Sequence, residues 1–234
     1  MELVVAHLDE LRTHITESFE SAARERDHLS LAISGGATAL VFLGALRAAR
    51  VNWSRVTVFW ADERAVPADS PESNYGVAQR LLLEPLGAGA PRALRMPGEH
   101  PDLEEAALQY DETLAFELRG RPLDLALLGV GEDGHVCSLF PGHPALQQVE
   151  HRVIAIHDAP KPPPRRLSLT MSFLSQTRKI LLVVLGPRKN PVLQAALART
   201  RLETPLDILV TEAKDTTIFT DQPIYRKVNQ QRNV

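Results

Sequence analysis

The amino-acid sequence predicts a doubly wound α/β fold, with a mostly parallel sheet and helices on both of its faces. Apolar runs of strand length alternate with helical patterns along the chain, which is the order expected when helices connect parallel strands. Several of these runs, such as "LDLALLGV" over 123–130, are apolar almost throughout, so both faces of those strands are expected to be buried. No linker divides the 234 residues, and we therefore expect one Rossmann-like domain over 1–234.

The first half of the chain alternates strands with helices. "HLSLAIS" (28–34) predicts a strand, "TALVFLGALRAAR" (38–50) a helix, and "RVTVFWA" (55–61) the next strand. Ser73 is placed to cap a helix over "NYGVAQRLLLEPL". A further helical pattern covers 102–119.

The second half contains more strand patterns than helical ones. The strands are expected at 123–130, 152–157, 166–171, 179–186 and 216–220. "NPVLQAALAR" (190–199) predicts a helix with a proline in its first turn, where proline is tolerated. "APKPPPRR" (159–166) is typical of a stiff, extended connector.

Composition excludes several classes of function. The formal net charge is −3, so no overall field attracts nucleic acid or an anionic membrane. No apolar stretch approaches the roughly 20 residues of a membrane span, and "MELVVAHLDELRTHI" carries acids where a signal peptide needs a basic start. Cys137 is the only cysteine, which favours a reducing compartment. We expect a soluble cytoplasmic monomer with no nucleic-acid or membrane partner.

Four loops are expected to share one edge of the sheet. In an open parallel sheet, ligands bind beyond the carboxyl ends of the strands, so the segment after each strand is informative. In chain order these segments are "SGGAT" (34–38), "DERAVP" (62–67), "GEDGHVCSLFPGH" (131–143) and "PRKN" (187–190).

The first and last of these loops suit an anion. Gly35 and Gly36 let the backbone approach a ligand closely, and the start of the following helix offers free N–H groups, with Ser34 and Thr38 alongside. Lys189 lies near another helix start, where a bound anion would offset the unfavourable helix dipole. A tight turn capped by Thr38 and a solvated surface lysine explain the same residues without a ligand.

"DER" (62–64) places two acids and an arginine at a strand end. Asp62 is a candidate base or orienting group, and the fork of Arg64 suits a carbonyl or phosphate oxygen. A surface ion-pair cluster is the alternative. Asn74 and Tyr75 suit either a polar site or local capping, and Arg165 and Arg166 either a phosphate clamp or an exposed loop.

"GVGEDGHVCSLF" (129–140) has two competing interpretations. Its first six residues fit the G-x-G-x-x-G pattern of dinucleotide loops, but prolines and glycines at 141–144 stop any helix that would follow. We therefore favour a catalytic loop in which Asp133 and His135 face the rim, with His135 as an acid–base group. We expect Cys137 to be a small buried residue. No His/Cys cluster has zinc spacing, and we expect no metal.

Taken together, these segments resemble one protein family. "SGGAT", "WADERAVPADSPESNYG", "GVGEDGHVCSLFPGHPAL", "KPPPRRLSLTMSFLS" and "GPRKNPVL" occur in the order seen in 6-phosphogluconolactonases, which are related to glucosamine-6-phosphate isomerases. The resemblance spans roughly 30–200. It implies hydrolysis of 6-phospho-D-glucono-1,5-lactone to 6-phosphogluconate in the oxidative pentose phosphate pathway, without an organic cofactor.

The resemblance also implies roles for individual residues. His135 resembles the general base that activates water, with Asp133 supporting it. Arg64 resembles the group that orients substrate or stabilises the oxyanion, with Asp62 beside it. The phosphate would lie between Gly35–Thr38, Arg166 and Lys189. The family's loop usually reads Ser-Gly-Gly-Ser-Thr-Pro, so Ala37 and Ala39 depart from it. The tail "TDQPIYRKVNQQRNV" resembles nothing in the family.

Two other functions compete with lactone hydrolysis. Related isomerases and deaminases read Asp-Glu-Tyr where this chain has Asp-Glu-Arg, and they carry an acid shortly after Asp-Gly-His, where this chain has "SLFPG". Both differences favour the lactonase. A non-enzymatic sugar-phosphate sensor would need the anion site but not His135. No G-x-S-x-G elbow is present, so attack by water is expected rather than an acyl-enzyme.

Overall fold

Within the part of the chain that the structure describes, the central sheet has seven strands, all paired in parallel. The structure is a computed structural model that describes residues 1–199 and 204–224. The strand order is β1-β10-β9-β6-β2-β3-β5, and every neighbouring pair is parallel. In chain order these strands are β1 (Glu2–Val5), β2 (Leu29–Ile33), β3 (Val56–Trp60), β5 (Arg92–Leu94), β6 (Leu125–Gly129), β9 (Lys179–Val184) and β10 (Thr216–Thr220).

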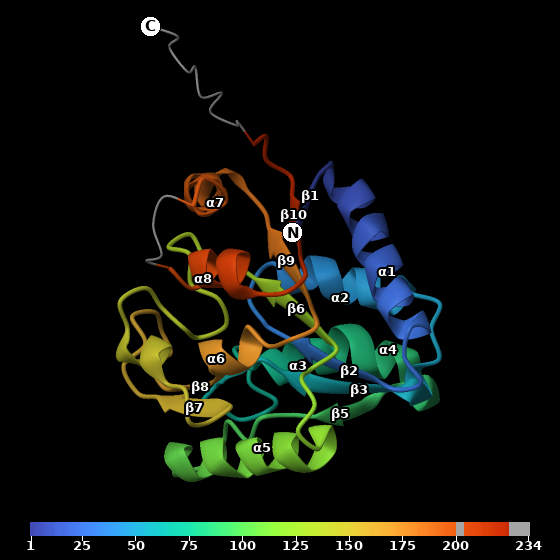
Figure 1. Ribbon diagram of the computed structural model, residues 1–234. Coiled ribbons are helices and arrows are strands. Elements are labelled where there is room, and N and C mark those ends of the chain that lie inside the picture. The colour runs from blue at the N-terminus through green and yellow to red at the C-terminus, as the bar shows by residue number, and fades with distance from the viewer. Residues whose placement is uncertain (200–203, 225–234) are drawn as a thin grey trace, which may run out of the picture.

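Helices cover both sides of this sheet, which confirms the predicted fold class. Figure 1 shows α1 and α2 on one side and α6 and α8 on the other. The helices are α1 (Leu8–Arg24), α2 (Ala39–Ala48), α3 (Asn74–Ala78), α4 (Glu84–Leu86), α5 (Leu103–Leu118), α6 (Met171–Leu174), α7 (Asn190–Leu197) and α8 (Pro205–Glu212). None of the helices within residues 1–199 and 204–224 is long and apolar enough to cross a membrane.

The chain reverses its direction across the sheet between β2 and β6. It builds β2, β3 and β5 toward one edge and then returns, so that β6 pairs with the other side of β2. β9 and β10 continue toward the opposite edge. A reversal of this kind leaves a crevice at the carboxyl ends of the two central strands. The loops that begin at Ser34 and Val130 therefore meet there.

A second, antiparallel sheet lies beside the first. It has the order β4-β8-β7, with β4 (Asp62–Arg64), β7 (Val153–Ile156) and β8 (Arg166–Leu169). The two strand patterns expected at 152–157 and 166–171 thus belong here and not to the parallel sheet. Ala61 is the crossing point, because its N–H donates to Ile33 of the large sheet and its carbonyl accepts from Leu169 of the small one.

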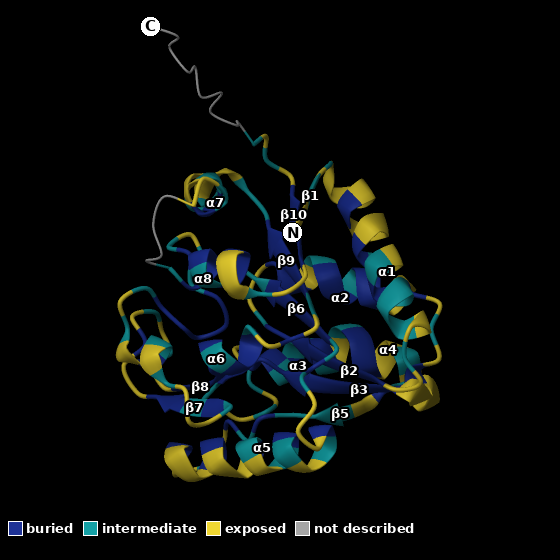
Figure 2. Ribbon diagram, viewed as in Figure 1, coloured by how far each residue is buried: buried dark blue, intermediate teal, exposed yellow. Residues whose placement is uncertain are grey.

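Most predicted elements are present, but the N-terminal elements were not anticipated. Leu11, Ile15 and Phe19 recur every four residues and are fully buried, which is the signature of an amphipathic helix. Figure 2 shows β2, β3, β6, β9 and β10 as buried almost throughout, whereas the edge strands β1 and β5 and the outer face of α5 are partly exposed. The tail at 220–234 is described only to residue 224.

Candidate active site

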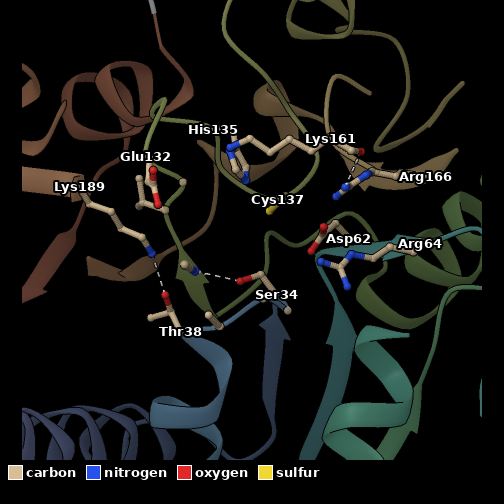
Figure 3. A pocket seen from close by; sticks show the side chains of 16 residues that line it. Ser34, Thr38, Asp62, Arg64, Glu132, His135, Cys137, Lys161, Arg166 and Lys189 are labelled. Atoms are coloured by element: carbon tan, nitrogen blue, oxygen red, sulfur yellow. Dashed lines mark hydrogen bonds between the residues drawn. The ribbon is translucent and has the colours of Figure 1, made fainter. Parts of the chain in front are cut away.

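One pocket gathers the loops that follow β2, β3, β6 and β9. It is lined by Ser34, Gly35, Gly36, Ala37, Thr38, Asp62, Arg64, Gly129, Val130, Gly131, Glu132, His135, Cys137, Lys161, Arg166 and Lys189. Figure 3 shows Lys189 and Thr38 on one side, Arg64 and Arg166 on the other, and His135 between them. Of the predicted site residues, all but Asp133 border this pocket, and Asp133 contacts His135.

The glycine loop is held to β6 and to the loop after β9. Ser34 Oγ accepts from the N–H of Gly129 at 2.9 Å, and Thr38 Oγ1 accepts from Lys189 Nζ at 3.0 Å. The Thr38 side chain does not cap α2, so the simple capping interpretation of this residue is wrong. Gly36 has a φ of +84°, a conformation that favours glycine. These bonds bring a lysine, a hydroxyl and the start of α2 together.

The three glycines of the 129–134 segment differ in what an added side chain would meet. A Cβ at Gly131 would lie 2.0 Å from Nδ1 of His135, and one at Gly129 would lie 3.4 Å from Thr38. Gly134 has a φ of +82°. No helix follows, because Val136 pairs with Val130 and Leu139 instead. Gly131 thus leaves room for the His135 ring and Gly134 allows a left-handed turn, whereas a Cβ at Gly129 would make only an ordinary contact with Thr38.

His135 and Asp133 form a close pair. Nδ1 of His135 lies 2.5 Å from Oδ1 of Asp133, which leaves Nε2 as the ring nitrogen able to take a proton. Burial lowers the pKa of His135 below its ordinary value of 6.5, while the hydrogen bond and charge of Asp133 work in the opposite direction. Although burial alone would raise it, contacts with His135 and Lys161 lower the pKa of Asp133 to about 2. His135 is therefore neutral, and Asp133 ionised, at neutral pH.

Asp62 is buried in a network of donors. Its Oδ2 accepts from Ser138 Oγ at 2.8 Å, and its Oδ1 accepts from Asn74 Nδ2 at 3.2 Å. Asn74 is placed by Glu63, whose carboxylate accepts from the N–H groups of Asn74 and Tyr75 at 2.7 and 2.8 Å. Burial raises the pKa of Glu63, although these bonds oppose the rise. The acidic cluster at 62–63 is thus interior and not a surface ion-pair cluster.

Arg64 and Arg166 are directly opposite each other in the register of β4 and β8. Like charges placed in this way repel each other, and a bound anion would remove the conflict. Arg64 donates to the carbonyl of Glu72 at 2.6 Å, but its Nε is buried without a hydrogen-bond partner among the residues described. Arg64 nevertheless borders the pocket, where its guanidinium is placed to bind a substrate oxygen.

Arg166 supports a loop as well as lining the pocket. Its guanidinium donates to the carbonyl oxygens of 161–163 and to Ser138 Oγ. Those four bonds use four of the five N–H groups of an arginine, so one remains for a ligand. Burial lowers the pKa of Arg166, as does the charge of Arg64, while Asp62 raises it.

Lys161 and Glu132 were not anticipated as site residues. Lys161 lies in the proline-rich stretch interpreted as a connector, yet its Nζ is 3.0 Å from Oδ2 of Asp133. Glu132 lines the pocket near Lys189 and raises the pKa of that lysine, against the larger lowering effect of burial. Both residues lie inside segments that carry the family resemblance, "KPPPRR" and "GVGEDGH", but the residue types alone did not indicate a role for either one.

Cys137 is buried, as expected, with a φ of +55°. Burial raises the pKa of its thiol well above the ordinary value, so the thiolate required of a nucleophile is disfavoured. Across residues 1–199 and 204–224, no three His, Cys, Asp or Glu side chains are grouped in a way that could hold a metal ion.

The chain is similar in sequence to known proteins over most of its length. The profile of the family described as glucosamine-6-phosphate isomerases/6-phosphogluconolactonase matches residues 5–219. A 6-phosphogluconolactonase of Mycobacterium tuberculosis is 37% identical over 187 residues, which cover 76% of this chain and 76% of the relative. The 6-phosphogluconolactonase of Homo sapiens is 39% identical over 183 residues, covering 75% of this chain and 70% of the relative.

The fold is also similar to that of a solved structure. The crystal structure of a 6-phosphogluconolactonase from Shewanella baltica matches with a TM-score of 0.82 and 27% sequence identity, covering 94% of this chain and 96% of that one.

Proposed function

Because the chain belongs to the glucosamine-6-phosphate isomerase/6-phosphogluconolactonase family, we propose that it hydrolyses 6-phospho-D-glucono-1,5-lactone to 6-phosphogluconate with water activated by His135. The reaction is the second step of the oxidative pentose phosphate pathway. The observation that carries the proposal is the position of His135, which is paired with Asp133, between two cationic sides of one pocket. The curated relatives named above carry the lactonase activity in their names.

The proposed reaction uses each side of the pocket differently. His135 Nε2 removes a proton from water, and the water oxygen adds to the lactone carbonyl. The Arg64 guanidinium, which borders the pocket, stabilises the oxyanion that forms. The carbonyl re-forms as the ring C–O bond breaks, and the imidazolium returns its proton to the departing ring oxygen. Asp133 keeps the imidazole in the required tautomer.

The phosphate of the substrate is assigned to the side formed by Gly35–Thr38 and Lys189. Lys189 Nζ donates one hydrogen bond, to Thr38 Oγ1, and an ammonium has three N–H groups. The backbone at the start of α2 adds further donors. Arg166 stays in the proposed phosphate site as a second cation, but most of its N–H groups hold the 161–163 carbonyls. Lys189 is therefore the principal charged ligand in this proposal.

Two features favour the lactonase over the isomerase/deaminase. Arg64 stands at the pocket where related isomerases have tyrosine, and the stretch 136–142 that follows His135 contains no acid. Isomerisation and ring opening need a second acid–base group of that kind. The Asp62 carboxylate already accepts hydrogen bonds from Ser138 and Asn74, which disfavours it as that second acid–base group.

Turnover of freshly prepared lactone by the purified protein tests the proposal. We expect formation of 6-phosphogluconate well above the spontaneous rate, and a kcat lower by about 100-fold or more in His135→Ala. Glucosamine-6-phosphate serves as the comparison substrate. Release of ammonia from it, with no effect on the lactone, would assign the isomerase/deaminase instead. Tight binding of both sugar phosphates with no turnover of either would identify a sensor. We also propose that the protein is a monomer in the cytoplasm. Size-exclusion chromatography tests the oligomeric state, and cell fractionation tests the location.

A further inference from the structure

Lys161 reaches the His135–Asp133 pair from a distant part of the chain. It lies between β7 and β8, in the stretch 159–166. Its Nζ is 3.0 Å from Oδ2 of Asp133 and 3.3 Å from Nδ1 of His135. Its backbone carbonyl accepts from Arg166 at 2.9 Å. The base of this side chain is thus fixed by a buried arginine, and its end is at the reacting pair.

We propose that Lys161 is a positioning residue, which holds Asp133 against His135 by occupying the second carboxylate oxygen of Asp133. The two oxygens of Asp133 have different partners, Oδ1 on His135 and Oδ2 on Lys161. A carboxylate tied at both oxygens cannot rotate away from the imidazole. The proposal rests on the proposed function, because it assigns Lys161 a role beside the His135–Asp133 pair that activates water.

The charge of Lys161 has a second consequence for the same pair. A cation close to an imidazole disfavours its protonated form, and Lys161 lowers the pKa of His135 as well as that of Asp133. Removing the cation would favour the protonated imidazolium and raise the pKa of His135. Lys161 therefore keeps Asp133 ionised and oriented while His135 stays neutral and able to act as a base.

Other charged groups also face His135. Asp133 and Glu132 lie on the same loop as His135, and the thiol of Cys137 also lines the pocket. The other charged residues are Asp62 and Arg64 of β4, Arg166 of β8, and Lys189 of the turn before α7. Among the residues described, only Asp133 and Lys161 lie within hydrogen-bond distance of an imidazole nitrogen, at 2.5 and 3.3 Å. The effect of Lys161 is therefore separable from the background by changing its charge alone.

The experiment measures the pKa of His135 by NMR in the full-length protein without substrate. The series is Lys161→Arg, Lys161→Met and Lys161→Glu, with the His135→Ala spectrum to assign the resonance. Lys179→Met is the matched control, since Lys179 pairs with Asp215 at 3.8 Å at the start of β9, the far end of the strands from the pocket. We expect the pKa to rise by about 0.5–1 unit in Lys161→Met, further in Lys161→Glu, and little in Lys161→Arg or Lys179→Met.

A second measurement separates positioning from direct contact with substrate. The dissociation constant of 6-phosphogluconate, measured by calorimetry at pH 8, should change by less than about threefold in Lys161→Met, because His135 is neutral at that pH in both proteins. A tenfold or greater loss of affinity, or a His135 pKa that does not move through the charge series, would overturn the proposal. The NMR series does not depend on turnover, so absence of lactonase activity in the wild type would refute the proposed function while leaving this test intact.

Discussion

Asn74 occupies the space that a side chain at Gly35 would need: a Cβ on residue 35 would lie 1.7 Å from Asn74 Oδ1. The same amide donates to the backbone carbonyl of Asp62 at 2.9 Å and to its carboxylate at 3.2 Å. The Asn74 amide thus lies between Gly35 and Asp62 and contacts both. The requirement for glycine at position 35 is one of space, whereas at Gly36 it is one of backbone conformation.

The first prediction follows from this contact. Gly35→Ala should destabilise the protein by about 1–3 kcal/mol, as an overpacked site does, and should reduce kcat/KM because the loop is displaced. Adding Asn74→Ala should recover part of the lost stability, with a coupling energy of about 1 kcal/mol or more in a double-mutant cycle measured by denaturant unfolding.

Gly36→Ala is the control for that cycle. Its added Cβ has open space around it, but the φ of +84° strains any other residue. It should also destabilise, yet Asn74→Ala should give no recovery. Equal coupling at the two glycines would contradict the steric explanation.

The second prediction concerns His135. Replacing it with alanine should lower kcat by about 100-fold or more, which is the usual size of a positioned acid–base effect. The affinity for 6-phosphogluconate should change little, because the phosphate ligands are untouched. Steady-state kinetics and calorimetry on the folded variant check both expectations, and a near-normal kcat would remove His135 from the mechanism.

The third prediction concerns the phosphate. Lys189→Ala should reduce kcat/KM by about 1.5–3 kcal/mol, the range for a lost hydrogen bond to a charged group. The wild type should strongly prefer the phosphorylated lactone over gluconolactone, and the variant should lose most of that preference. Exposed Lys214 provides the control substitution. Equal wild-type activity on the two lactones would exclude a phosphate site.

Arg166→Ala should differ from Lys189→Ala in its effect on thermal stability. We expect a comparable loss of kcat/KM, of about 1.5–3 kcal/mol, together with a lower Tm. The reason is that Arg166 also holds the carbonyls of 161–163. Thermal unfolding of the two variants distinguishes these cases, and an unchanged Tm for Arg166→Ala would show that its loop contacts are dispensable.

The fourth prediction is the pH dependence of kcat/KM. Neighbouring acids alone would suggest a raised His135 pKa, but burial outweighs them and lowers it below 6.5. A base acts only when neutral, so activity should persist below pH 6.5 and then fall as one proton is added. The measurement covers pH 4 to 8, with the spontaneous rate subtracted and a correction for the substrate phosphate, which titrates near about pH 6. A fall centred at about pH 4, in the ordinary range of a carboxyl group, would make a carboxylate of the pocket the general base in place of His135.

The fold class and most of the candidate site could be predicted from the amino-acid sequence. Apolar runs and helical patterns depend on neighbouring residues, so they could be recognised one segment at a time. The parallel sheet then places Gly35, Asp62, His135 and Lys189 at one edge, because the strands before them end on the same side. The N-terminal helix was equally accessible, since Leu11, Ile15 and Phe19 have the required spacing.

The contacts between side chains from distant segments depend on how the elements pack in three dimensions. The register of β4 against β8 sets Arg64 opposite Arg166, and the path of 159–164 brings Lys161 to Asp133, 28 positions before it in the chain. The contact between Asn74 and the space at Gly35 likewise joins two separate loops. Contacts between residues this far apart in the chain arise from how separate elements pack, and packing depends on side chains throughout the core. Local patterns carry no information about them, which is why Lys161 could be assigned to the site only from the structure.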